Sequence, residues 1–190
     1  TAAYPPERRP SCRLFYVRSF TMPRITEQPG IGRNLLAFLD MIAWSELGSD
    51  YLKRSDDGYN VIVTGIDGKL ELFTDYKAHP FMGGRKSKQI NSRGLTSNAS
   101  GRYQQMLRDW PHYRDLLKLP DFGPVSQDRL AIQHIRECRA LPDVIAGRIE
   151  PAIDKCRNIW ASLPGAGYGQ REHRTQDLLA VYARALKVLV

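Results

Sequence analysis

The segment from Leu35 to Glu46 carries an apolar stripe at helical spacing, and a glutamate continues that stripe. Positions 35, 38, 39 and 42 are Leu, Phe, Leu and Ile, and Glu46 is the next position on the same face. This spacing is typical of a helix that buries one face in a core. It predicts a helix over 34–47, with Asn34 as N-cap and Gly48 as its end. Because burying an unpaired carboxylate is costly, Glu46 is expected to have a partner or a chemical task.

The rest of the chain indicates a small β element followed by helices. Asp67-Gly68 is a hairpin turn signal between two apolar runs, so strands are expected near 60–64 and 70–74. Residues 79–99, rich in Gly, Ser, Lys and Asn, are expected to form a basic mobile loop. Helices are expected over 101–110, 111–118, from Ser126 through Cys138, 142–147, 150–162 and 174–188, with a loop at 163–170. The expected fold class is α+β, a mainly helical domain with a minor antiparallel hairpin.

The basic N-terminus leaves several kinds of partner open. Residues 1–33 hold six arginines and two glutamates, which is half of the net charge of +8. Such a segment suits an anionic polymer, a membrane surface or nucleic acid, and a solvated tail without a specific role fits as well. We expect 1–33 to be a flexible extension and 34–190 to be the folded domain. Met22 reads as a translation start, so residues 1–21 are expected to be upstream or added sequence.

Other patterns exclude several classes of site. Three cysteines cannot all pair, and neither they nor the four histidines have metal-ligand spacing, so no disulfide framework, metal or cofactor is expected. The glycine-rich run at 165–170 opens no strand–helix unit, which argues against a nucleotide site. No apolar run is long enough to cross a bilayer, and no secretory signal is visible.

The position of Glu46 suits the acid of a glycosidase. Such an acid must protonate a leaving oxygen near neutral pH, and an apolar pocket with an adjacent aromatic ring raises its pKa. Trp44 is close in sequence but lies on a different helix face. From this pattern alone, a catalytic glutamate and a solvated glutamate at a frayed helix end both remain open.

Six blocks of the chain resemble the lambda-type phage endolysins, a family of lysozyme-like lytic transglycosylases of bacterial cell walls. The blocks are AFLDMIAWSE (37–46), GYNVIV (58–63), ELFTDY (71–76), SGRYQ (100–104), ALPDVI (140–145) and NIWASLPGAGYGQ (158–170). They span about 34–186 in the family's order and at similar spacing. Residues 1–33 have no clear counterpart in the family. The segment TGIDGKLE (64–71) is longer than the corresponding segment of the family, and the loop at 81–95 differs from it in sequence. The resemblance implies a lysozyme-like fold with the hairpin beside an active-site cleft.

The resemblance also implies roles for individual residues. Glu46 would be the catalytic acid and base. Gly101-Arg102-Tyr103-Gln104 resembles the family's Gly-x-x-Gln element, in which the glutamine binds sugar near the cleavage point. We therefore expect Gln104 and the adjacent Tyr103 to bind substrate, although by pattern alone Gln104 would be a surface glutamine. The loop at 165–170 would form one lip of the cleft, with Tyr168 and Gln170 facing sugar.

The implied reaction uses a single carboxyl group. Glu46 would protonate the oxygen between N-acetylmuramic acid and N-acetylglucosamine and then take the proton of the muramic C6 hydroxyl, which closes on C1 as a 1,6-anhydro sugar. A hydrolytic muramidase would need a second carboxylate. The candidates by sequence are Asp50, Asp56, Asp57, Asp67, Glu71 and Asp75, and no pattern selects one of them.

Two other classes of protein remain as alternatives. A basic nucleic-acid-binding module would fit the charge but lacks a reading motif. A non-catalytic wall-binding protein is the other alternative. Loss of lysis in the variant Glu46→Gln would indicate an enzyme instead. The resemblance implies peptidoglycan glycan strands as the partner, no nucleic acid, no stable membrane insertion and a monomer. It also implies accumulation in the host cytoplasm until a holin opens the membrane, followed by action on periplasmic peptidoglycan.

Overall fold

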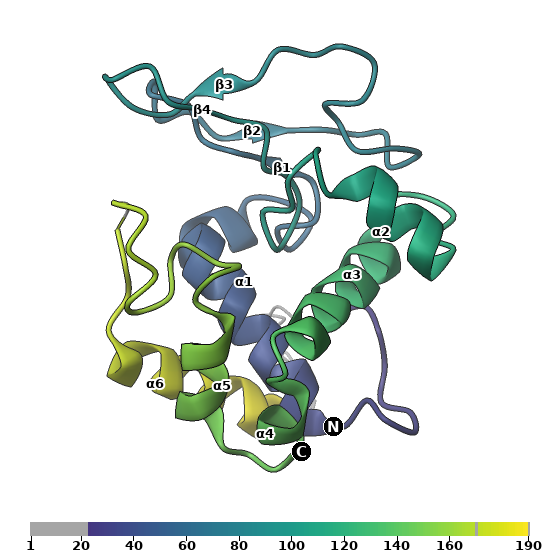
Figure 1. The fold of residues 1–190 in the computed structure, drawn as a ribbon, viewed down its shortest axis with the longest axis vertical. Helices are drawn as coiled ribbons and strands as arrows, with labels where there is room; N and C mark the ends of the chain where they lie inside the picture. Colours follow the sequence, from purple (N-terminus) through teal and green to yellow (C-terminus); the bar gives the residue numbers. More distant parts are fainter. Residues whose placement is uncertain (1–22, 170, 190) are drawn as a thin grey trace, which may run out of the picture.

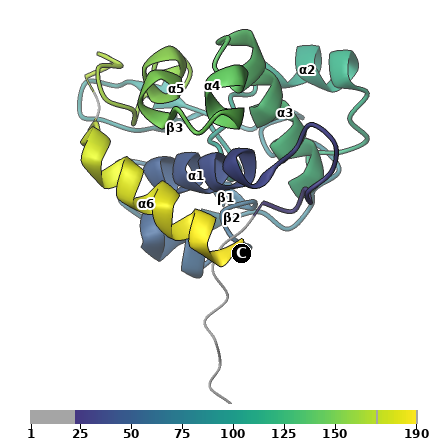
Figure 2. The same ribbon diagram turned by 90° about the horizontal axis from the view of Figure 1, so that it is seen from below.

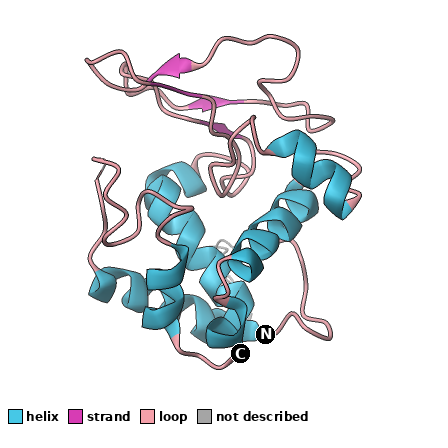
Figure 3. Ribbon diagram, viewed as in Figure 1, coloured by secondary structure: helices cyan, strands magenta, loops and turns pink. Residues whose placement is uncertain are grey.

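A computed structural model describes residues 23–169 and 171–189, which form six helices and two small antiparallel sheets (Figures 1 and 3). The helices are α1 (Arg33–Lys53), α2 (Trp110–Leu117), α3 (Pro124–Glu137), α4 (Leu141–Ile145), α5 (Ile149–Cys156) and α6 (Thr175–Val188). The strands are β1 (Val61–Ile62), β2 (Glu71–Leu72), β3 (Lys88–Gln89) and β4 (Thr96–Ser97). The α+β class predicted from the sequence is confirmed.

Helix α1 lies at the centre of the helical part. Every residue from Leu35 to Ala43 is buried, and α6, α4 and α3 all contact this helix (Figure 2). A helix that is covered on all sides needs no polar face. The predicted apolar stripe is therefore correct, but it is one part of a surface that is buried all round.

Gly48 interrupts α1 without ending it. Its φ of 69° and ψ of 165° are not helical, yet the helix resumes and reaches Lys53. Glycine adopts positive φ at little cost, and the Trp44 side chain bridges the interruption by donating from Nε1 to Ser49 Oγ at 2.9 Å. Glu46 thus lies in the last regular turn before the kink.

The strands form two hairpins that are joined to each other. In the first, Val61 pairs with Leu72 and Ile62 with Glu71, where strands were predicted but over a shorter length. The second, β3–β4, falls within 79–99, so the prediction of a loop there was wrong. Its two-residue polar strands show no alternation that a sequence pattern could reveal. The Ile66 amide donates to the Gln89 carbonyl at 2.8 Å and connects the hairpins.

Residues 101–104 and 107–109 form turns and Gln105 forms a β-bridge with Ser100, so the helix predicted over 101–110 is wrong. Gly101 and Gln104 have φ of 79° and 48°, values that a right-handed helix does not accept. The Gly101 amide donates to the Val61 carbonyl at 2.7 Å. This turn is therefore attached to the free edge of β1. Helix α2 then begins at Trp110 with Pro111 in its first turn, as predicted.

The remaining helices match the predictions apart from their ends. Helix α3 begins at Pro124, two residues before Ser126, and α5 ends at Cys156 instead of near 162. Helix α6 lies where it was predicted. No helix in the described part of the chain is both long and apolar enough to span a bilayer.

The described part of the N-terminal extension contacts the domain. The amide of Arg24 donates to the Tyr59 hydroxyl at 2.9 Å, and the amide of Ile25, itself buried, donates to Asp128 Oδ2 at 2.8 Å. Residues 1–22 lie outside the described residues, so the nature of that segment stays a prediction.

Candidate active site

A cleft of about 560 Å³ brings together α1, both hairpins, the 101–104 turn and the loop at 163–169. In Figure 1 this loop rises beside α1 toward the hairpins. The lining residues are Glu46, Leu47, Tyr51, Val61, Val63, Thr64, Ile90, Asn91, Arg93, Leu95, Gln104, Tyr168 and Gly169. The two residues expected to act nearest the cleavage point, Glu46 and Gln104, therefore face the same cavity.

Glu46 is half-buried in the cleft, and its carboxyl group has a raised pKa. Burial raises its pKa from 4.5 to about 7 because the anion loses water. The hydroxyl of Ser162 donates to Glu46 Oε1 at 2.5 Å, and this bond and the Ser162 backbone amide oppose the rise by favouring the anion. A carboxyl group with this pKa can both give and take a proton near pH 7.

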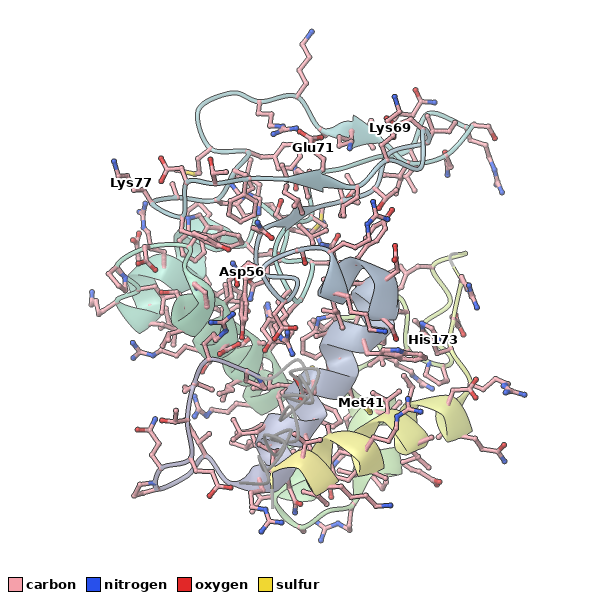
Figure 4. All side chains as sticks on the ribbon, turned by 180° about the vertical axis from the view of Figure 1, so that it is seen from behind. Met41, Asp56, Lys69, Glu71, Lys77 and His173 are labelled. Carbon is pink, nitrogen blue, oxygen red and sulfur yellow. The ribbon has the colours of Figure 1, made fainter. Side chains whose placement is uncertain are left out.

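Ser45 contacts Ser162 of the Glu46–Ser162 pair, and His173 in turn contacts Ser45. Ser162 Oγ lies 3.0 Å from Ser45 Oγ, and the Ser45 hydroxyl donates to the Ile42 carbonyl at 2.8 Å. The His173 ring, which Figure 4 shows beside α1, has its Nε2 3.1 Å from the Ser45 carbonyl oxygen. The same ring packs on Trp44 with the ring centroids 4.7 Å apart. The Trp44 indole thus contacts His173 and Ser49. The raised pKa of Glu46 results from burial and not from a contact with this ring.

Gln104 is held in a left-handed conformation at the end of the Gly-x-x-Gln turn. Its Nε2 donates to the Gly101 carbonyl at 3.0 Å, which leaves the side-chain oxygen and the second N–H of Nε2 available to a ligand. The turn itself is anchored by Arg102. This fully buried guanidinium pairs with the carboxylates of Asp40 and Asp57, and the Arg102 amide donates to Gln127 Oε1 at 2.9 Å.

Tyr103 does not line the cleft, contrary to the expectation that it binds substrate. Its side chain is only 1% exposed, and its hydroxyl donates to Asp128 Oδ1 at 2.6 Å. Its carbonyl accepts from Trp160 Nε1 at 3.2 Å. Within this tight turn, neighbouring side chains point in different directions, so Tyr103 enters the core while Gln104 reaches the cavity.

Tyr168 lies where the resemblance implied, at the lip of the cleft. It is 55% exposed, and its hydroxyl donates to the Asn158 carbonyl at 2.9 Å. The Glu172 carboxylate accepts from the amides of Gly165 and Gly167, both at 2.8 Å, and so closes the loop on itself. Gln170 lies outside the described residues.

Several residues of the site had no recognisable signal in the sequence. Ser45 and Ser162 lie within the blocks 37–46 and 158–170, but no pattern gave either a role, and His173 lies outside the blocks. Their roles come from contacts between α1 and the segment before α6. Asn91 and Arg93 line the cleft from the segment 81–95, in which the chain differs from the family.

Glu46 is the sole carboxylate among the described residues that line the cleft. The other candidates are engaged elsewhere. Glu71 accepts from Arg85 and from Lys88, the latter at 3.1 Å, and the Arg85 bond holds the pKa of Glu71 below its usual range. Asp50 pairs with Arg54 and Asp56 with Arg24, both at 2.8 Å. Asp57 pairs with Arg102, and Asp67 and Asp75 each accept from a backbone amide two residues on.

The described residues also contain no group of three or more His, Cys, Asp or Glu side chains arranged to hold a metal ion. Figure 4 shows Glu71 on the hairpin side of the molecule and Asp56 in the loop that follows α1.

Comparison with known proteins identifies the family. A family model described as endolysin matches residues 36–189. The endolysin of Escherichia phage P2 is 61% identical over 153 residues, which cover 80% of this chain and 93% of the relative. The chain belongs to the endolysin family. This endolysin is also 52% identical to that of Escherichia phage lambda over 151 residues, covering 78% of this chain and 89% of the relative.

The fold of this endolysin matches solved structures of lambda lysozyme. A complex of that lysozyme with a chitohexasaccharide aligns with a TM-score of 0.73 and 48% identity, covering 85% of this chain and 97% of the other. A second structure of lysozyme from bacteriophage lambda aligns with a TM-score of 0.68 and 46% identity over the same shares. The lysozyme-like fold implied by the sequence blocks is confirmed.

Proposed function

We propose that this endolysin degrades bacterial peptidoglycan for host cell lysis by cutting the β-1,4 bond between N-acetylmuramic acid and N-acetylglucosamine without water, leaving 1,6-anhydro ends. The observation that supports this proposal is the single carboxyl group of the cleft. Glu46 is half-buried with a pKa of about 7, and no second carboxylate is present among the described lining residues. A reaction in which one group is first acid and then base fits such a site.

In the proposed reaction, Glu46 gives its proton to the glycosidic oxygen as the bond to muramic C1 breaks. The carboxylate that results then takes the proton of the muramic C6 hydroxyl, whose oxygen closes on C1. Glu46 ends in its starting state, and the nucleophile comes from the substrate. The raised pKa suits the first step, because the proton is present near neutral pH and is given up readily.

Gln104 and Tyr168 are the proposed sugar contacts. Both line the cleft with Glu46, and Gln104 presents an amide oxygen that can accept from a sugar hydroxyl or acetamido group. Gln170 stays a proposed contact from the resemblance alone. The related lambda lysozyme was solved in complex with a chitohexasaccharide, which supports a glycan as the ligand of this cleft. We also propose that the protein acts as a monomer and reaches the periplasm through a holin.

A hydrolytic muramidase is the second candidate, because the lysozyme fold serves both reactions. It requires a carboxylate positioned to bind water or to attack C1. Glu71, on the hairpin beside the cleft, is a candidate for this carboxylate, but it forms ion pairs with Arg85 and Lys88. Its use would require those ion pairs to open.

Mass spectrometry of muropeptides from purified peptidoglycan tests the proposal. Wild type should release anhydro-muramic ends, which are one water lighter than reducing ends, and Glu46→Gln should release almost none. Glu71→Gln is the matched control and should give wild-type products. Reducing ends that disappear in Glu71→Gln would establish the muramidase, and full release by Glu46→Gln would show that another residue is the acid.

A further inference from the structure

The hydroxyl of Ser162 has one proton and two neighbouring oxygens. Its Oγ lies 2.5 Å from Glu46 Oε1 and 3.0 Å from Ser45 Oγ. A serine hydroxyl donates only once, and the Ser45 proton is already directed to the Ile42 carbonyl at 2.8 Å. The Ser162 proton must therefore go to Glu46 or to Ser45. The shorter contact and the greater charge on a carboxyl oxygen both favour Glu46 Oε1.

We propose that Ser162 is a positioning residue that keeps the transferable proton of Glu46 on Oε2. An oxygen that accepts a hydrogen bond from Ser162 acts as the carbonyl-type oxygen of the protonated acid, so the acid proton belongs to the other oxygen. This role rests on the proposed function of Glu46. In both proton transfers Oε2 would then be the reacting atom: it loses its proton to the glycosidic oxygen and regains one from the C6 hydroxyl, while Oε1 stays bound to Ser162.

The opposite arrangement would be unproductive. If Ser162 donated to Ser45, Glu46 could donate its own proton to Ser162, and the chain would run from Glu46 through both serines to the Ile42 carbonyl. The acid proton would then point into the protein and away from a bound sugar. The 2.5 Å contact to Glu46, set against 3.0 Å to Ser45, is the geometric reason to assign the productive direction.

Two segments hold the Ser162 hydroxyl in place. From α1, Ser45 lies beside it, and from the segment before α6 the His173 amide donates to the Ser162 carbonyl at 2.9 Å. The His173 ring also contacts the Ser45 carbonyl. The loop that forms the lip of the cleft is thereby connected to the orientation of the acid on α1.

The other titratable and charged groups near Glu46 are the same in wild type and in the Ser162 variants, so their pH profiles can be compared. The titratable or charged side chains that share the cleft are Tyr51 of α1, Arg93 of the second hairpin and Tyr168 of the loop. His173 lies behind the pair. All four are retained when Ser162 is replaced, so a difference between Ser162 variants reports the Ser162 hydroxyl.

The experiment compares Ser162→Ala, Ser162→Thr and Ser126→Ala by the pH profile of kcat/KM on purified peptidoglycan. Loss of the donor in Ser162→Ala removes a bond that favours the anion, so the alkaline limb should move up by about one pH unit. The value of kcat at the optimum should fall by about tenfold with KM unchanged, because the proton is no longer confined to Oε2. Ser162→Thr keeps the hydroxyl and should restore both quantities. Ser126→Ala is the control, because Ser126 of α3 also donates to a carboxylate, that of Asp121 at 3.0 Å, but does not line the cleft. It should leave the alkaline limb in place.

A wild-type profile for Ser162→Ala would overturn the proposal, as would an equal shift of the limb in Ser126→Ala. Carbon-13 NMR titration of the Glu46 carboxyl supplies a readout that is independent of turnover and should show the same rise. If Ser162→Ala fails to fold, Ser162→Cys, with its weak thiol donor, should shift in the same direction. An active Glu46→Gln would defeat the proposed function, whereas an inactive Glu46→Gln with an unaffected Ser162→Ala would defeat only this inference.

Discussion

Gly101 packs directly against the side-chain amide of Gln127, and a methyl group added to Gly101 would lie 2.2 Å from Gln127 Oε1. Gln127 of α3 binds three backbone groups: it accepts from the Arg102 amide at 2.9 Å and donates to the carbonyls of Tyr59 and Phe122 at 2.9 and 2.8 Å. The glycine of the Gly-x-x-Gln element is therefore required by packing and by its φ of 79°. Its glutamine is the residue that faces the cleft.

Gly101→Ala should lower the free energy of unfolding by about 2 kcal/mol or more, because it combines a left-handed conformation with a clash against an anchored side chain. Urea denaturation measures the change. Gly68→Ala is the matched control: Gly68 also has positive φ, 67°, but has open space around it, so only about 1 kcal/mol is expected. Equal losses in the two variants would mean that Gln127 moves aside.

Glu46→Gln should stabilise the protein at alkaline pH. The pKa of Glu46 rises from 4.5 to about 7 on folding through burial, so the folded state holds this proton more tightly than the unfolded chain does. Its contribution is fully present below pH 4.5 and is lost as pH rises toward about 7. We expect Glu46→Gln to exceed wild type by up to about 3 kcal/mol at pH 8 and to match it at pH 4. A difference that does not vary with pH would contradict the raised pKa.

Asp40→Ala should destabilise the protein strongly. Arg102 is fully buried, with its guanidinium beside the Asp40 carboxylate and 5.1 Å from the Tyr59 ring centroid. Removing one partner of a buried pair leaves uncompensated charge, which costs about 3–5 kcal/mol. Asp50→Ala breaks the exposed pair with Arg54, the C-cap residue of the same helix, and should cost at most about 0.5 kcal/mol. Chemical denaturation of the two variants gives the comparison, and similar costs would show that Asp57 alone neutralises Arg102.

Glu172→Ala should loosen the lip of the cleft. The Glu172 carboxylate accepts from the Gly165 and Gly167 amides, and these bonds hold its pKa below the usual range. Hydrogen exchange at these two amides should become faster, and KM should rise several-fold with little change in kcat, since Tyr168 is carried by this loop while Glu46 is not. Exchange rates equal to those of wild type would show that the glycine loop keeps its shape without the carboxylate.

The sequence determined those parts of the protein whose physics is local. The apolar stripe at 35–42 required a buried helix, Asp67-Gly68 required a tight turn between two strands, and Pro111 fitted only the first turn of α2. Each signal lies within one element, where side-chain periodicity or a fixed φ decides the outcome. The family blocks indicated the lysozyme-like fold, which the comparisons confirm, and placed Glu46 at the end of the buried stripe.

Tertiary structure decided how that glutamate is used. Ser162 meets Glu46 from 116 positions away in the chain, and its hydrogen bond with Glu46 exists only because the segment before α6 packs on α1. The side chain of Tyr103 lies in the core and that of the adjacent Gln104 faces the cleft. This difference arises because the 101–104 turn is hydrogen-bonded to β1 and packs on Gln127. The short strands β3 and β4 form because they pair with each other, and not because their residues have a high strand propensity. Distance, burial and direction are properties of packed segments, and no periodicity along the chain encodes them.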